Sequence, residues 1–183
     1  MPPSRQADRV ARSGANIFGR RARRAVVAIG VVALAGALTA GLLIAAPAHP
    51  SRPAPVLPRA VLHAPAVTLA TLRGHAAMIV FWASWCGPCH AEAPAIERFA
   101  RSAAGAGHVV ALSEGENVTN ARKFIAHYGW TFPVLSDPAG VTSGQFGVLG
   151  LPTTVVLNAK GQIVRALLGP QSVRSLTAAI AAA

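Results

Sequence analysis

The chain has 183 residues, of which 52% are hydrophobic, and a formal net charge of +11 at pH 7. The first 24 residues hold seven arginines against one acid, Asp8, so this short tail alone carries +6 (seven minus one). The other ten bases are scattered singly through the remaining 159 residues, a distribution that argues against a nucleic-acid-binding protein.

The basic tail, residues 1–24, precedes an uncharged apolar run over residues 25–46. As a helix this run would extend about 33 Å, enough to cross a hydrocarbon core of about 30 Å. Because arginines flank only its N-terminal side, we predict a single-pass signal anchor in the cell membrane, with a cytoplasmic tail and an extracytoplasmic domain. A secreted protein cleaved near Ala48 is the alternative, but cleaved signals usually have apolar stretches of only about 7–15 residues.

Residues 47–62 contain five prolines between Pro47 and Pro58, which predicts an extended linker of polyproline type. The remaining residues, 63–183, are enough for one domain with one core.

The pattern of apolar residues in this domain predicts alternating strands and helices. Residues 67–74 alternate apolar and polar, which indicates a short strand or an extended entry to the domain. The continuous apolar run 76–83 indicates a strand buried on both faces. Further along, the periodicity predicts a helix at 91–104, a strand at 108–112, a helix at 117–129, a strand at 132–137, a turn or short helix at 139–147, a hairpin at 153–169 and a closing helix from Ser172. This order is typical of a three-layer α/β fold with a mixed central sheet.

Residues 85–90 read WCGPCH and fit two chemistries. Cys-x-x-Cys-His is the attachment pattern of a c-type haem, with His90 as the iron ligand, whereas Cys-x-x-Cys near a βαβ pattern indicates a redox dithiol. Cys86 and Cys89 are the only cysteines, and a bridge that closes so short a loop adds little stability. We therefore expect the pair to take part in chemistry rather than to stabilise the fold as a structural disulfide.

The strand–loop–helix context favours the dithiol. The strand that ends near Trp82 delivers Cys86 to the first turn of a helix, where free N–H groups and the helix dipole stabilise a thiolate. We assign Cys86 as the nucleophile and the more buried Cys89 as the resolving thiol. A covalent haem would displace this packing, and a zinc site needs a second ligand pair that the scattered histidines do not supply, so we predict no metal site.

Several stretches resemble the thioredoxin superfamily: VFWASWCGPC followed by Pro94, FPVLSD, and GLPTTVVLNAKGQIV. Together with the N-terminal apolar run, they are similar to the membrane-anchored TlpA/ResA/CcmG-type thiol-disulfide oxidoreductases, over about residues 66–182. The resemblance implies a thioredoxin-like three-layer α/β fold with a mixed central sheet, preceded by one transmembrane helix.

The resemblance also implies a substrate-binding surface around the dithiol. Pro152 corresponds to the cis-proline of the superfamily, and the backbone of Leu151 would pair with the bound substrate chain. Trp85, Gly87 and Pro88 would form the side of this surface next to the nucleophile.

Glu92 follows Cys89 by three residues and matches a glutamate of the subfamily. If burial raises its pKa, it can shuttle a proton to and from the thiols; a solvated helix carboxylate is the alternative. Cytoplasmic thioredoxins carry a buried acid where this chain has Val80, a departure that leaves Glu92 or water as the proton acceptor.

Three polar residues near the motif are expected to be unremarkable parts of the surface. Neighbouring side chains on a helix diverge, so we expect His90 to be an exposed bystander, with electrostatic tuning of the thiolates as the alternative. Glu114 and Glu116 flank a glycine in a predicted loop and are expected to be solvated.

The sequence thus predicts an extracytoplasmic thiol-disulfide oxidoreductase that reduces disulfides of secreted proteins, for example apocytochrome c during cytochrome c maturation. Its redox centre is the Cys86–Cys89 pair with no cofactor, its partners are protein disulfides, and a membrane thiol reductase supplies the electrons. The Gly-Pro dipeptide does not fix the direction of electron flow, so a disulfide oxidase or isomerase of the same fold is the alternative. A c-type haem electron carrier and a copper-delivery protein are the alternatives from other classes.

Overall fold

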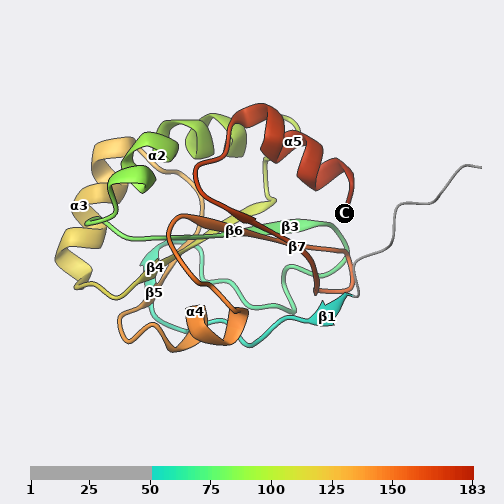
Figure 1. Ribbon diagram of the computed structural model, residues 1–183, viewed down its shortest axis with the longest axis horizontal. Helices are drawn as coiled ribbons and strands as arrows, with labels where there is room; N and C mark the ends of the chain where they lie inside the picture. The colour runs from blue at the N-terminus through green and yellow to red at the C-terminus, as the bar shows by residue number, and fades with distance from the viewer. Residues whose placement is uncertain (1–50) are drawn as a thin grey trace, which may run out of the picture. The chain divides into compact units, whose positions relative to one another are not determined.

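The computed structural model describes residues 51–183 (Figure 1). The helices are α2 (Gly87–Ala100), α3 (Val118–Tyr128), α4 (Val141–Phe146) and α5 (Val173–Ala181). The strands are β1 (Arg52–Pro53), β2 (Val61–His63), β3 (Ala77–Trp82), β4 (Val109–Glu114), β5 (Val134–Asp137), β6 (Thr153–Leu157) and β7 (Gln162–Leu168).

All the described strands belong to one sheet, in the order β1-β7-β6-β3-β4-β5-β2. β3, β4 and β5 run parallel to one another, and β6 and β7 extend the sheet as an antiparallel hairpin. The central sheet is therefore mixed, as predicted.

The central strand β3 is buried along its whole length because helices cover both faces of the sheet. Met78, Val80 and Trp82 pack on the face covered by α2, α3 and α5. The alternate residues Ile79 and Phe81 belong to the second core cluster, which includes Phe146 of α4. Figure 1 shows these two helical layers on opposite sides of the sheet, which confirms the three-layer architecture.

The helix ends form where their capping residues predict. Asn117 caps α3 by accepting a hydrogen bond from the Asn120 amide (2.9 Å), and Gly129 ends it with a φ of 62°. Ser172 caps α5 in the same way through Ser175.

The strand predicted over residues 67–74 is wrong, because residues 69–74 form turns. Thr68 and Thr71 bind each other's backbone: the Thr71 hydroxyl donates to the Thr68 carbonyl at 2.8 Å and accepts from the Thr68 amide at 3.0 Å. The threonine hydroxyls thus form hydrogen bonds with backbone groups that a neighbouring strand would otherwise bind. The apolar alternation that suggested a strand places Leu72 in the core while its neighbours face solvent.

The described part of the predicted linker, residues 51–62, belongs to the folded domain. β1 pairs with β7 at one edge of the sheet, and β2 pairs with β5 at the other. Proline is tolerated at a sheet edge because the N–H it lacks is not needed there, and Leu57 anchors the segment in the core. The domain therefore includes residues before the predicted boundary at residue 63.

The chain enters the domain beside the β6–β7 turn, since Arg52 is paired with Ile163. This turn lies at the end of the sheet where β3 begins, because Ala77 pairs with Leu157. Cys86 follows the other end of β3.

The predicted tail (1–24), the predicted anchor (25–46) and the alternative cleavage site near Ala48 lie outside the described residues. Among residues 51–183, no helix is long and apolar enough to cross a membrane.

Candidate active site

The two cysteines lie at the start of α2 and form a disulfide. Cys86 is the N-cap residue, and its Sγ accepts a hydrogen bond from the Cys89 amide at 3.2 Å. Pro88 occupies the first turn, where the missing N–H has no helical partner to lose. The predicted placement of Cys86 at a helix N-terminus is confirmed, and the same amide is positioned to stabilise a Cys86 thiolate.

A groove of about 460 Å³ runs beside Cys86. Trp85, Cys86, Gly87 and Pro88 line one side of it, while Val148–Leu151 and Glu114 line the rest. Trp85 is 65% exposed and Leu149 is 96% exposed, so two large apolar side chains stand free at the groove. Such a surface can take up another polypeptide.

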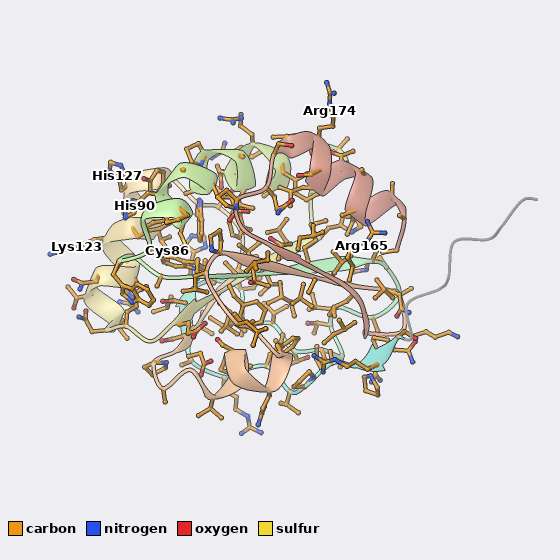
Figure 2. The ribbon with its side chains drawn as sticks, in the orientation of Figure 1. Cys86, His90, Lys123, His127, Arg165 and Arg174 are labelled. Carbon is orange, nitrogen blue, oxygen red and sulfur yellow. A yellow bond between two sulfur atoms is a disulfide. The ribbon has the colours of Figure 1, made fainter. Side chains whose placement is uncertain are left out.

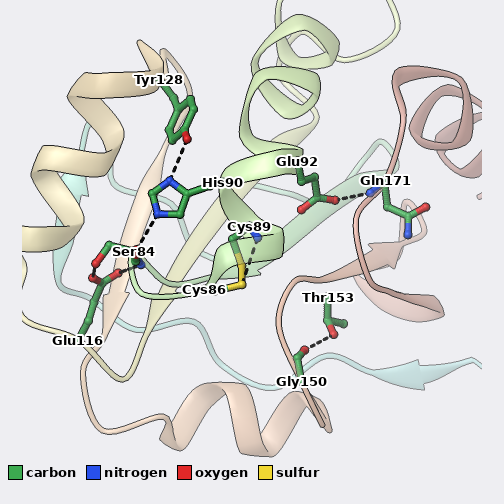
Figure 3. Close-up of a disulfide and its surroundings, with 10 residues drawn as sticks. All are labelled: Ser84, Cys86, Cys89, His90, Glu92, Glu116, Tyr128, Gly150, Thr153 and Gln171. Carbon is green, nitrogen blue, oxygen red and sulfur yellow. Dashed lines mark hydrogen bonds between the residues drawn. A yellow bond between two sulfur atoms is a disulfide. The ribbon is translucent and has the colours of Figure 1, made fainter.

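The predicted substrate-binding residues come together at this groove. Leu151 lines it, and the Leu151–Pro152 peptide bond is cis, as predicted. The Thr153 hydroxyl donates to the Gly150 carbonyl at 2.7 Å and holds the loop before the bond (Figure 3). Both cysteines are buried, Cys86 with 5% and Cys89 with 2% of its surface exposed, but only Cys86 lines the groove. Cys86 is therefore the more accessible of the two sulfurs.

Glu92 is buried rather than solvated, with only 3% of its surface exposed. Burial raises its pKa to about 7, against the opposing effect of a hydrogen bond that its Oε1 accepts from the Gln171 amide at 2.8 Å. Glu92 lies one helical turn after Cys89, on the same side of α2 (Figure 3). A carboxyl group that titrates near neutral pH therefore stands next to the resolving thiol.

Glu114 is not the solvated loop residue that the sequence suggested. β4 continues to Glu114, which pairs with Asp137 of β5 and lines the groove beside Cys86. Its Oε2 is buried without a hydrogen-bond partner among the described residues. Burial raises the pKa of Glu114, the charge of Asp137 raises it further, and a hydrogen bond from Ser143 opposes the change.

Glu116 is also bound rather than solvated. Its Oε1 accepts hydrogen bonds from the Ser84 amide (3.0 Å) and the Ser113 hydroxyl (2.7 Å), and its Oε2 accepts one from the Ser84 hydroxyl. Gly115 suggested a free loop, but the parallel pairing of β3 and β4, in which Trp82 lies opposite Ser113, brings this segment against the loop before Cys86.

His90 is exposed, as predicted, but both its ring nitrogens are engaged. Nδ1 lies 2.8 Å from the Tyr128 hydroxyl, and Nε2 lies 2.8 Å from the Ser84 carbonyl (Figure 3). This arrangement does not fit a haem ligand, since neither nitrogen is directed at open space. Among residues 51–183, no cluster of three or more histidine, cysteine or acidic residues forms a metal site.

Comparisons with known proteins agree with this geometry. The model of the AhpC/TSA family matches residues 51–166, well over half of the chain. The chain belongs to the AhpC/TSA family. One relative, named thiol-disulfide oxidoreductase ResA, from Bacillus thuringiensis, is 30% identical to this chain over 111 residues. That match covers 60% of this chain and 64% of the relative, which is just under two thirds of its length.

Solved structures place this AhpC/TSA member in the thioredoxin-like fold. A DsbF homologue from Corynebacterium diphtheriae superposes with a TM-score of 0.65 at 23% identity, covering 73% of this chain and 88% of that one. A secreted Mycobacterium tuberculosis disulfide oxidoreductase, homologous to E. coli DsbE, has a TM-score of 0.59 at 27% identity and covers 68% and 94%. The predicted thioredoxin-like α/β fold with a mixed sheet is confirmed.

Proposed function

We propose that this protein is an extracytoplasmic thiol-disulfide oxidoreductase that reduces disulfides of secreted proteins through Cys86 and Cys89. The observation that carries the proposal is the position of the pair: Cys86 caps α2 and lines a groove with Trp85 and Leu149, while Cys89 lies outside the groove, one helical turn before the buried Glu92. The relatives named as thiol-disulfide oxidoreductases support the same activity.

The reaction begins with the reduced pair. The Cys86 thiolate attacks one sulfur of a substrate disulfide; a bond forms between Cys86 and that sulfur, and the other substrate sulfur leaves as a thiolate. Cys89 then loses its proton and attacks the Sγ of Cys86. The Cys86–Cys89 disulfide forms, the second substrate sulfur leaves, and two electrons have passed to the substrate, which takes up two protons.

Glu92 receives the proton that Cys89 loses in the second step. A carboxyl group with a pKa of about 7 is partly ionised at neutral pH, so it can accept this proton and later release it. Val80 occupies the strand position where an acid would otherwise perform this task, and it is buried among apolar side chains.

The cellular setting is part of the proposal. The apolar run 25–46 with arginines on one flank supports a single-pass anchor that holds the catalytic domain outside the cytoplasm. A membrane thiol reductase would return two electrons to the Cys86–Cys89 disulfide, and no further cofactor is needed. Apocytochrome c, whose haem-binding thiols must be reduced, is the substrate that we propose first.

Trapping tests the assignment of the two thiols. The full chain carrying Cys89→Ala should form a stable mixed disulfide through Cys86 with a peptide that contains one disulfide, visible as an added mass that dithiothreitol removes. Cys86→Ala should trap nothing. Trapping by Cys86→Ala instead would reverse the assignment.

Titration of the wild-type chain in glutathione buffers tests the direction of electron flow. A reduction potential well below that of the glutathione pool supports a reductase, and a potential well above it would make the protein an oxidase or isomerase. A Soret band in the purified chain would indicate haem attachment. One Cu(I) per dithiol with weak disulfide exchange would indicate copper delivery.

A further inference from the structure

Ser84, two residues before the nucleophile, is held by hydrogen bonds on both sides. Its amide and its hydroxyl both donate to Glu116, the amide at 3.0 Å, and its carbonyl lies 2.8 Å from Nε2 of His90. Figure 3 shows Glu116 and His90 approaching Ser84 from different directions. The only three polar groups of this residue are therefore all engaged.

His90 connects the loop before Cys86 to α3. A carbonyl oxygen only accepts hydrogen bonds, so Nε2 carries the hydrogen, and Nδ1 faces the Tyr128 hydroxyl at 2.8 Å. The ring also packs on Phe124, with centroids 4.8 Å apart. Neutral His90 accepts from Tyr128, and charged His90 donates to it, so the link survives in both states.

Glu116 connects the same loop to β4. Its Oε1 also accepts the Ser113 hydroxyl at 2.7 Å, which fixes the carboxylate against the end of that strand. The loop between β3 and α2 is thus tied to β4 on one side and to α3 on the other. In contrast, Trp85 is 65% exposed, so packing alone does not fix the loop.

We propose that His90 and Glu116 are positioning residues that, by holding Ser84, fix Cys86 at the N-terminus of α2. The Cys86 thiolate depends on short contacts with the free amides of the first turn, and these contacts weaken quickly with displacement. The inference rests on the proposed disulfide exchange, since it concerns the nucleophile of that reaction.

The test compares His90→Phe with His127→Phe in the full chain, with Cys89→Ala in both so that Cys86 reacts alone. Phenylalanine keeps the ring that packs on Phe124 but removes both nitrogens. His127 lines the same pocket as Ser84 and His90 and its ring contacts Tyr128 edge-on, but it makes no hydrogen bond to the loop, so it is the matched control (Figure 2). The measurement is the pH dependence of Cys86 alkylation.

We expect His90→Phe to shift the midpoint of alkylation to higher pH and to slow alkylation at pH 7 about threefold, because the thiolate loses part of its stabilisation. His127→Phe should match the parent. Glu116→Asp keeps the carboxylate charge but shortens the side chain by one methylene, so it should weaken the hold on Ser84 and shift the midpoint in the same direction. Tyr128→Phe removes one hydroxyl and should give a smaller shift in a fold that is otherwise unchanged.

Identical midpoints in the parent, His90→Phe, Glu116→Asp and Tyr128→Phe would overturn the inference. This result is distinct from failure of the proposed function, which would appear as a wild-type chain that exchanges no disulfide at all. If His90→Phe no longer unfolds cooperatively, Tyr128→Phe becomes the test. The inference then stands only if the alkylation midpoint of Tyr128→Phe lies at higher pH than that of the parent.

Discussion

The two sulfurs of one disulfide lie in different surroundings. On the Cys86 side, the groove exposes Trp85 and Leu149 to approaching molecules. On the Cys89 side, Glu92 is enclosed within the protein and bound to the amide of Gln171. The difference is consistent with the roles that we propose, with partner contact at the first cysteine and proton transfer at the second, one helical turn away.

The largest expected effect concerns Glu92, on the enclosed Cys89 side of the disulfide. The pKa of Glu92 is about 7 in the folded chain and near 4.5 when unfolded, so the folded state holds its proton more tightly and stability falls as pH rises through this window. Glu92→Gln removes the cost of burying the charge. We expect it to raise the free energy of unfolding by about 3 kcal/mol at pH 8 and to change little at pH 4.

Urea denaturation of the oxidised full chain at both pH values, followed by tryptophan fluorescence, measures this difference. Glu97→Gln is the control, since Glu97 is another buried glutamate of α2 but accepts from Thr131 and pairs with Arg101. This control should not stabilise the chain. An equal gain for Glu92→Gln at pH 4 and pH 8 would contradict a buried, titrating carboxyl group.

The next largest effect concerns Trp85, at the groove on the Cys86 side of the disulfide. Trp85→Ala should slow exchange with a protein disulfide about tenfold, in line with the roughly 1–2 kcal/mol that an exposed aromatic anchor contributes to an interface. Exchange with a small aliphatic disulfide should be unchanged, as should the free energy of unfolding. Val56→Ala removes another exposed apolar side chain, which lies outside the groove, and is the control. Equal slowing with both substrates would assign Trp85 to the chemistry rather than to partner contact.

The smallest effect concerns the acid within the groove. The pKa of Glu114 is raised by burial, so its ionisation also opposes folding as pH rises. Glu114→Gln should therefore stabilise the chain at pH 8, by less than Glu92→Gln because Glu114 is less buried. The same denaturation experiment at pH 4 and pH 8 measures it. A larger gain in the free energy of unfolding for Glu114→Gln than for Glu92→Gln would contradict the view that the Cys89 side is the more enclosed of the two.

Much of the fold could be predicted because local signals agreed with tertiary packing. The apolar run of β3, the Ser172 cap and the cysteine pair each have a short-range cause, and the structure places them as expected. The turns at 69–74 were missed because threonine hydroxyls bonded within the segment, which hydrophobic periodicity does not register. Residues 51–62 were misassigned because their partners, β5 and β7, lie far along the chain.

The residues of the site also fall into those that local sequence could predict and those that it could not. Cys86, Cys89 and Pro152 belong to short motifs, whereas the roles of His90, Glu114 and Glu116 depend on contacts between elements. The hydrogen-bond partner of the buried Glu92 is the backbone amide of Gln171, which lies 79 residues away in the sequence. The link from His90 to Tyr128 spans 38 residues. A single sequence offers no local pattern for such pairs.

The entry of the chain beside the β6–β7 turn has a geometric consequence. The point where residue 51 joins the domain and the reactive sulfur lie at opposite ends of β3, a separation of about 20 Å along the strand. A domain held from its N-terminal end, by a lipid bilayer or by a chemical support, presents its dithiol outward. In such an arrangement, only a molecule on the side of the attachment would have to reach past the body of the domain to exchange electrons with Cys86.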